Sequence, residues 1–533
     1  MAVANDGKPA RGPEGTPVAR MARAASVVLV LNLLSRVLGF VRDASIAARF
    51  GAGPATDAYL VAYTIPFFLQ TILGMAFVTV MVPVVTTYLV RGDRDQGWAV
   101  ASAVGNWTAL ILGLLTIVGL GVAPWLVRLM APGFPAPVFD LAVKLTRIMF
   151  LSLAFMGTGM LVSGILNAGY IFTSPALAPA VSNLVIIATV IFAGSAFGIT
   201  GLAVGTVLSF VAYLLIQLPD LPRLQFHYTC SLMAGHPAVR RIGRHLLPVC
   251  FSLAVVQLYL ATNRFFASQL EPGSITALDF ANRLVNLPLG VFVASVTTAI
   301  FPSLAEQAAL NDRREMAHLT DRGLGLVALT ILPAAVGMIV LRVPLVQLVF
   351  QRGAFDPRAT AMTAVAVLFY SVGLLAQAMH PILTRAFYAL QDVVVPVVTG
   401  IISVGLNILL SYFLAPRLGH GGLALANSLA ASIYALMLYL ALYRRLPELK
   451  VTLFLSTMLR IFLAAMGMGL LVWLAGRGLH VFTWSRPLLG LLVRMTLLMG
   501  GGGLAFWVLA RCLKVEEVTF ITAMIRRRLE RVF

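Results

Sequence analysis

The chain has 533 residues, of which 60% are hydrophobic and 11% charged, and its mean hydropathy is +0.93. This composition excludes the ordinary soluble classes, in which about a quarter of the residues are charged. The 39 basic residues outnumber the 20 acidic ones, but no folded basic domain gathers them, which argues against a nucleic-acid partner. The composition therefore predicts a protein that lies mostly within a membrane.

The first 25 residues are polar and rich in Pro and Gly. They lack an apolar run followed by a small-residue cleavage site, so we expect an uncleaved first helix. Beyond them, apolar stretches of about 20 residues recur, each long enough to cross about 30 Å of hydrocarbon. We predict an all-α integral membrane protein of about fourteen transmembrane helices. The predicted helices are 26–49, 57–89, 99–130, 140–167, 174–196, 200–219, 245–270, 276–304, 321–350, 360–389, 394–415, 421–443, 453–476 and 487–512.

Charges interrupt the first helix, 26–49. Arg36 stands roughly ten residues, or about 15 Å, from the cytoplasmic end, which places it near mid-bilayer. At about 100° per residue, Arg36 and Asp43 share a face, whereas Arg42 points about 120° away from Arg36. Such charges cost several kcal/mol in lipid, so they must face water or polar partners. Either an Arg36–Asp43 ion pair only fixes the packing, or these charges belong to a binding site.

A second mid-membrane arginine lies in helix 276–304. Arg283 is about ten residues from the outer face, and Asp279, one turn earlier, could pair with it. The two helices together hold three such arginines and two aspartates, so positive charge remains in excess even if both carboxylates are paired. This excess favours an anionic substrate. Arginine suits a phosphate because its planar fork donates two hydrogen bonds at once and it stays charged when partly buried.

The basic residues between helices follow a topological bias. With the N-terminus inside, alternate loops carry roughly twenty-two Lys and Arg, against fewer than about ten on the other side. Both termini are therefore expected in the cytoplasm.

A weak internal repeat predicts how the helices are grouped. A shift of 219 residues lays Ala58, Ala62, Thr79 and Pro83 on Ala277, Ala281, Thr298 and Pro302. Six helices would then repeat six, as two lobes related by an axis along the membrane normal with a substrate site between them. The predicted organisation is a cytoplasmic tail (1–25), an N-lobe (26–220), a basic cytoplasmic linker (221–244), a C-lobe (245–446), two further helices (447–513) and a basic cytoplasmic tail (514–533).

Signatures of catalysis and metal binding are missing from the sequence. It contains no HExxH, GxSxG or Walker motif and no paired-carboxylate site. The three cysteines, Cys230, Cys250 and Cys512, lack metal-ligand spacing. We expect neither an enzyme nor a cofactor or metal site. A membrane protein with a substrate site between two lobes is expected to transport that substrate. Because the sequence has no nucleotide-binding motif, this transport must draw its energy from an ion gradient or from the membrane potential.

Several motifs carry a resemblance. The strings Ser35-Arg-Val-Leu-Gly-Phe-Val-Arg-Asp43, Phe50-Gly-Ala-Gly53, Ala281-Asn-Arg-Leu284 and Phe350-Gln-Arg-Gly-Ala-Phe355 resemble those of the MurJ (MviN) family. These are the lipid II flippases of the multidrug/oligosaccharidyl-lipid/polysaccharide (MOP) exporter superfamily. The resemblance implies a two-lobed, fourteen-helix protein of the inner (cytoplasmic) membrane that exposes a central cationic cavity alternately to each side. Its partners would be membrane lipids and its cargo lipid II, the undecaprenyl-pyrophosphate-linked peptidoglycan precursor.

The resemblance also implies functional positions. Those expected to bind substrate are Ser35, Arg36, Arg42, Asp43, Gln70 and Arg283. Asp57, at the outer mouth of the second helix, would act in gating. Gln70 is a departure, because many members have a functional arginine there. Some members also resemble sodium-coupled carriers with acidic residues in helices 7 and 11, where this chain holds Asn263 and Ser411, which argues against sodium coupling.

Several functions remain open from the sequence. A lipid II flippase explains the arginines, the repeat and the motifs together. An exporter of another polyprenyl-pyrophosphate-linked glycan would share all of these except the family motifs, and Gln70 keeps it open. A multidrug exporter would need carboxylates for its cationic substrates, and a non-transporting scaffold would leave the mid-membrane arginines without a purpose.

Overall fold

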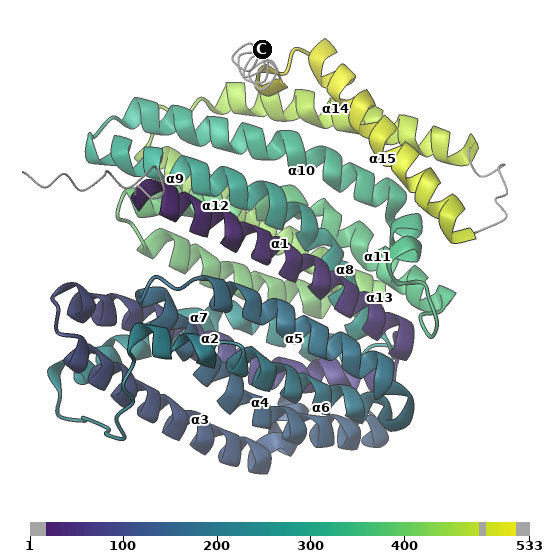
Figure 1. The fold of residues 1–533 in the computed structure, drawn as a ribbon. Helices are drawn as coiled ribbons and strands as arrows, with labels where there is room; N and C mark the ends of the chain where they lie inside the picture. The colour runs from purple at the N-terminus through teal and green to yellow at the C-terminus, as the bar shows by residue number, and fades with distance from the viewer. Residues whose placement is uncertain (1–16, 479–486, 519–533) are drawn as a thin grey trace, which may run out of the picture. The chain divides into compact units, whose positions relative to one another are not determined.

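The computed structural model describes residues 17–478 and 487–518, apart from the side chains of some helical stretches, among them 17–25, 70, 73–81 and 245–256. The regular structure of this part is helical throughout. The long helices are α1 (Pro17–Phe50), α2 (Pro54–Val90), α3 (Arg94–Met130), α4 (Ala136–Ala168), α5 (Thr173–Phe192), α6 (Gly194–Leu215), α7 (Pro237–Ala267), α8 (Ser274–Pro288), α9 (Ala294–Ala309), α10 (Arg313–Phe350), α11 (Pro357–Val372), α12 (Leu374–Ala389), α13 (Val394–Arg445), α14 (Val451–Gly478) and α15 (Pro487–Cys512) (Figure 1).

The chain falls into two compact units. Among the described residues, unit 1 comprises 17–45, 65–123 and 144–254. Unit 2 comprises the described residues 46–64, 124–143, 255–478 and 487–518.

Nine helices in the described residues are long and apolar enough to cross a membrane, or ten if the bent pair α11 and α12 is one span. The sequence-based total is higher for two reasons. It counts α13 as two spans. It also includes α1, α2 and α7, and the structure does not describe the side chains along parts of these three helices. The multi-pass, all-helical class is thus confirmed, and the total of fourteen stays a prediction.

Two glycines divide long helical segments in the same way. A straight helix of 52 residues, the length of α13, would measure about 78 Å, far more than the thickness of the hydrocarbon core. Gly419 breaks it with φ 58° and ψ −140°, and Gly198 breaks α6 with φ 56° and ψ −144°. Only glycine adopts this conformation readily. The two positions are 221 residues apart and separate the fifth from the sixth, and the eleventh from the twelfth, predicted span.

A second turn repeats at the same separation. Tyr170 follows α4 and Gln391 follows α12, and both adopt a left-handed backbone, with φ 62° and 59°. The amide after each donates to the carbonyl five residues before it, at 2.9 Å in both turns. The six-helix repeat predicted from a few sequence identities therefore has a counterpart in backbone geometry.

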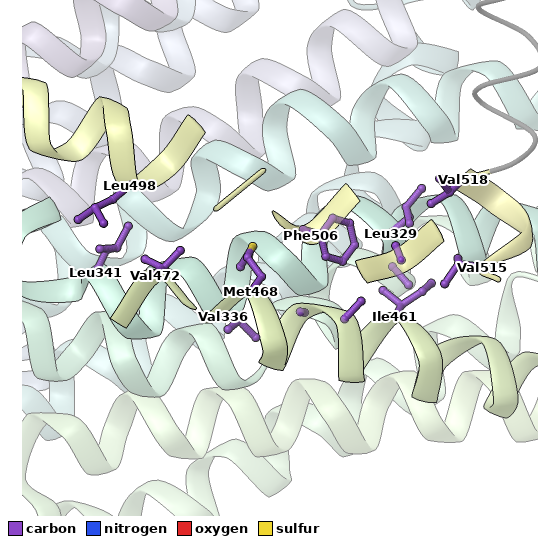
Figure 2. Close-up of a cluster of buried hydrophobic side chains, with 14 of the residues drawn as sticks. Leu329, Val336, Leu341, Ile461, Met468, Val472, Leu498, Phe506, Val515 and Val518 are labelled. Carbon is purple, nitrogen blue, oxygen red and sulfur yellow. The ribbon is translucent and has the colours of Figure 1, made fainter. Parts of the chain in front are cut away.

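Helices α14 and α15 are packed against α10 within unit 2, where they lie side by side in Figure 1. Figure 2 shows the apolar side chains that fill this interface, among them Val336 of α10, Met468 of α14 and Phe506 of α15. Inside a bilayer such packing stabilises helix association mainly through van der Waals contact, because lipid solvates an isolated helix equally well. The two helices after residue 446 are therefore an integral part of unit 2.

The segment that precedes α7 is tied to α3 within unit 1. The Asn106 side-chain amide donates to the carbonyls of Thr229 and Ser231, at 3.1 and 2.9 Å, and the Trp107 indole donates to that of Leu232 at 3.0 Å. Non-helical backbone near a membrane needs such partners for its polar groups. Part of the linker predicted at 221–244 is thus held against a helix, and α7 begins within it at Pro237.

Candidate functional site

The charges of α1 are held by α5 within unit 1. Arg42 donates to Asp43 at 2.8 Å, and the side chains are 23% and 9% exposed. A second Arg42 nitrogen donates to Asn183 of α5 at 3.0 Å, and the Asn183 amide donates to the Ser35 carbonyl at 3.1 Å. Arg42 therefore has a fixed orientation, while Arg36 lies on an exposed part of α1.

This arrangement corrects the expected pairing on α1. Helical spacing favoured Asp43 facing Arg36, whereas the structure pairs it with Arg42, its neighbour in sequence. A guanidinium on a long stem can turn back toward the adjacent side chain, which a helical wheel drawn from Cα positions ignores. Arg36 is thereby left out of this ion pair.

Unit 2 contains an aspartate shared by two arginines. Arg283 donates to one oxygen of Asp279 at 2.7 Å, which confirms the pairing expected one turn apart. Arg264 of α7 donates to the other oxygen at 2.5 Å. Arg264 is only 5% exposed, and its guanidinium also donates to the Ile275 carbonyl at 3.3 Å. The three charged side chains have a formal sum of +1.

Asp57 of α2 caps the N-terminus of α8. It is 3% exposed, and it accepts hydrogen bonds from the Gly273 amide at 2.6 Å and from the amide and hydroxyl of Thr276 at 2.8 and 2.6 Å. The α8 helix has no side-chain cap of its own, so Asp57 satisfies amides that would otherwise be buried without partners, and its charge suits the helix dipole. Asp57 and Thr276 are separated by the 219-residue shift of the repeat.

Replacing Asp57 by alanine is expected to lower the free energy of unfolding by about 1–3 kcal/mol, because buried amides lose their acceptor. Asn should retain more stability, since its carbonyl oxygen still accepts. Asp356 is the control, because it caps the neighbouring α11 as that helix's own N-cap residue, through the Ala359 amide at 2.7 Å, and is exposed. Its loss should cost about 1 kcal/mol or less. Thermal unfolding of the purified protein measures both. Equal effects of the two alanine variants would contradict the role given to Asp57.

A cluster of buried, neutral polar side chains comes from α7 and α13 of unit 2. Asn263 of α7 and Asn407 and Ser411 of α13 are 7%, 0% and 0% exposed. Side-chain oxygens of all three have no hydrogen-bond partner in the described structure, and the Tyr259 side chain lies beside the two asparagines. Hard cations prefer carboxylate oxygens, and Arg264 next along α7 adds positive charge. These residues therefore fit a sodium ion poorly, and a polar site of this kind calls for bound water.

The structure thus brings together some of the predicted residues and not others. Ser35, Arg42 and Asp43 share one hydrogen-bonded group in unit 1, while Arg283 belongs to the Asp279 cluster of unit 2. Gln70 lies in α2, but its side chain is outside the described residues. Among described side chains, no group of three or more His, Cys, Asp or Glu could hold a metal.

Sequence reasoning missed two residues that organise these groups. Nothing in the sequence marks Asn183 as the partner of Arg42, because a single asparagine in an apolar helix is common. Arg264 could have been noticed from the sequence, because it is a charged residue inside the predicted helix 245–270. It stands six residues from the outer end of that helix, however, where a long side chain can reach the surface and needs no partner.

The sequence profile of the lipid II flippase MurJ family matches residues 46–492, more than half of the chain. Arg283 lies inside this range, and Arg36 and Arg42 precede it. A protein of Burkholderia cenocepacia named lipid II flippase MurJ is 33% identical over 432 residues, which cover 79% of this chain and 84% of that protein.

Solved structures agree with this match. A structure of a lipid II flippase MurJ in an inward closed conformation superposes with a TM-score of 0.76 at 25% identity, covering 91% of this chain and 97% of that one. A multidrug resistance MATE family transporter of the MOP superfamily, in an inward-facing conformation, superposes with a TM-score of 0.65 at 18% identity, covering 80% and 99%; this second likeness concerns the fold alone. By its sequence and its fold, the chain belongs to the MurJ family of lipid II flippases.

Proposed function

We propose that this chain moves lipid II from the cytoplasmic to the outer leaflet of the membrane by alternating access. The observation that carries the proposal is an excess of arginine within the membrane segments of both units. In unit 2, Arg264 and Arg283 share the single aspartate Asp279. In unit 1, Arg42 pairs with Asp43, and Arg36 is exposed on the same helix. Such groups are costly in a bilayer unless an anion or water meets them. A pyrophosphate offers that anion and matches the two donors of each guanidinium fork.

Each residue then has a role in the proposed transport. Arg36, Arg42 and Arg283 contact the pyrophosphate, and Asp43 orients Arg42. Ser35 and Gln70 contribute polar contacts to the head group. Asp57 acts in gating, because its release from α8 would uncover the buried helix N-terminus. A cationic drug would be repelled by the same arginines, which disfavours a multidrug exporter.

Complementation tests the proposed cargo. Cells depleted of their own lipid II flippase should survive and keep their shape when they express this chain. Survival with the wild-type chain but not with the Arg283→Ala variant, at equal membrane abundance, is the expected result. Failure of the wild-type chain at normal abundance would count against lipid II and would favour another polyprenyl-linked glycan.

We also propose that both termini are cytoplasmic, on the strength of the charge bias. In a chain whose native cysteines are replaced, a cysteine at Pro357 should react with an impermeant thiol reagent from outside, and one at Glu448 should not. Both positions are exposed, so reactivity reports the side of the membrane rather than burial. Gly273 would be a poor probe, because it is buried with φ 94°. Labelling in the opposite pattern would overturn the orientation.

A further inference from the structure

Arg264 is more deeply buried than Arg283, the other arginine that pairs with Asp279. It is 5% exposed, and its side-chain partners are the Asp279 carboxylate and the Ile275 carbonyl. The side chain of Arg283, on the far side of the same carboxylate, is 28% exposed. Asp279 therefore lies between a buried arginine and a more accessible one. Of the two arginines, Arg283 is therefore the one that a dissolved anion can reach.

The buried arginine changes the charge that Arg283 presents. With Arg283 alone, one aspartate and one arginine would sum to zero, and an approaching anion would meet a neutral pair. With Arg264 on the second oxygen, the three side chains sum to +1. A buried pair is costly to break by removing one partner, so Asp279 stays fixed between the two arginines.

A second carboxylate, that of Asp57, lies close enough to Arg264 to affect the charge of the cluster. Asp57 interacts electrostatically with Arg264, but both of its oxygens accept hydrogen bonds from the first turn of α8. The positive end of that helix dipole offsets part of its charge. Asp57 therefore does not take the place of Asp279 as the partner of Arg264.

We propose that Arg264 is a positioning residue for substrate binding: it occupies one side of Asp279, holds the carboxylate in place and keeps the Arg283 cluster at a net positive charge. This inference rests on the proposed function, in which Arg283 contacts the pyrophosphate. It assigns to Arg264 no contact with the substrate. When Arg264 or Asp279 is substituted and Arg283 is kept, the affinity for a pyrophosphate should then follow the summed charge of the cluster and not the number of hydrogen bonds within it.

Three variants of the full-length protein separate charge from packing. Arg264→Gln can keep a hydrogen bond to Asp279 but brings the sum to zero, and it should weaken lipid II binding by about tenfold, the effect expected of one unit charge at several ångströms. Arg264→Lys keeps the charge and should bind nearly as well as wild type. The double variant R264Q/D279N restores the sum to +1 and should recover most of the affinity. Arg358→Gln is the control, because it removes a charge from an exposed pair with Glu271, whose side chains are 58% and 54% exposed.

The measurement is the dissociation constant for lipid II in detergent, with the thermal unfolding midpoint of each variant alongside. A purely structural role would make affinity follow the unfolding midpoint, and the double variant would then recover affinity only as far as it recovers stability. Wild-type affinity in Arg264→Gln, or a double variant as weak as Arg264→Gln, would overturn the inference. If wild type itself fails to bind lipid II, the proposed function fails instead. If Arg264→Gln does not fold, the lysine and double variants still decide the matter.

Discussion

Replacing Arg283 by lysine is expected to reduce lipid II transport nearly as far as replacing it by alanine. Lysine keeps the charge but offers a single ammonium in place of a planar fork, so it cannot bind Asp279 and a phosphate in fixed directions at once. Losing one hydrogen bond to a charged group costs roughly 1.5–3 kcal/mol, or a loss on the order of 10- to 100-fold. The same substitution at Arg36 should have a similar effect.

The measurement is the initial rate of transport at equal abundance of each variant in the membrane. Arg358→Lys serves as the control, because its ion pair with Glu271 is exposed and such pairs contribute little. Full activity of both the Arg36 and Arg283 lysine variants would rule out bidentate recognition of the phosphate. Charge alone would then suffice.

Collapsing the membrane potential is expected to impair transport far more than removing sodium. Lipid II carries negative charge, and an interior held negative drives that charge outward with about 2.3 kcal/mol per charge per 100 mV. Depolarisation should therefore lower accumulation in the outer leaflet by roughly 50-fold for each net charge that crosses a 100 mV field. Sodium should be dispensable, because Asn263, Asn407 and Ser411 form a neutral cluster beside Arg264.

The test replaces sodium by choline at a fixed potential and then dissipates the potential with an ionophore. Transport that stops in choline yet survives depolarisation would contradict this account of coupling. In that case the neutral cluster would be the first place to substitute, with Ser411→Asp expected to strengthen the dependence on sodium.

The sequence could locate charges but not their partners. Arg36, Arg42 and Arg283 stand out because a charge in an apolar run is rare and costly. The Arg42–Asp43 pair and its contact with Asn183 depend on how α1 packs against α5, 141 residues away, and helical spacing does not encode that. The Arg264–Asp279 contact joins two helices across a short turn, which a periodicity argument cannot orient.

Much of the fold was predictable because hydrophobic length is a strong signal in a membrane protein. The positions at which helices break or bend were harder to predict. Gly198 and Gly419 stand in predicted gaps between helices, where turns were expected, yet the structure runs helical segments up to each glycine. Likewise Gly373 lies within the single predicted helix 360–389, whereas α11 and α12 meet there with a bend of 45°. A single glycine in an apolar stretch gives no indication of whether it packs or bends.

The most direct test of the central claim is transbilayer movement of lipid II by the purified protein in liposomes with a defined potential. We expect lipid II to reach the opposite leaflet faster than in protein-free liposomes, and Arg283→Ala to abolish the difference. A polyprenyl lipid without a phosphate group should not be moved. Equal rates with and without the protein, or equal movement of the uncharged lipid, would contradict the account.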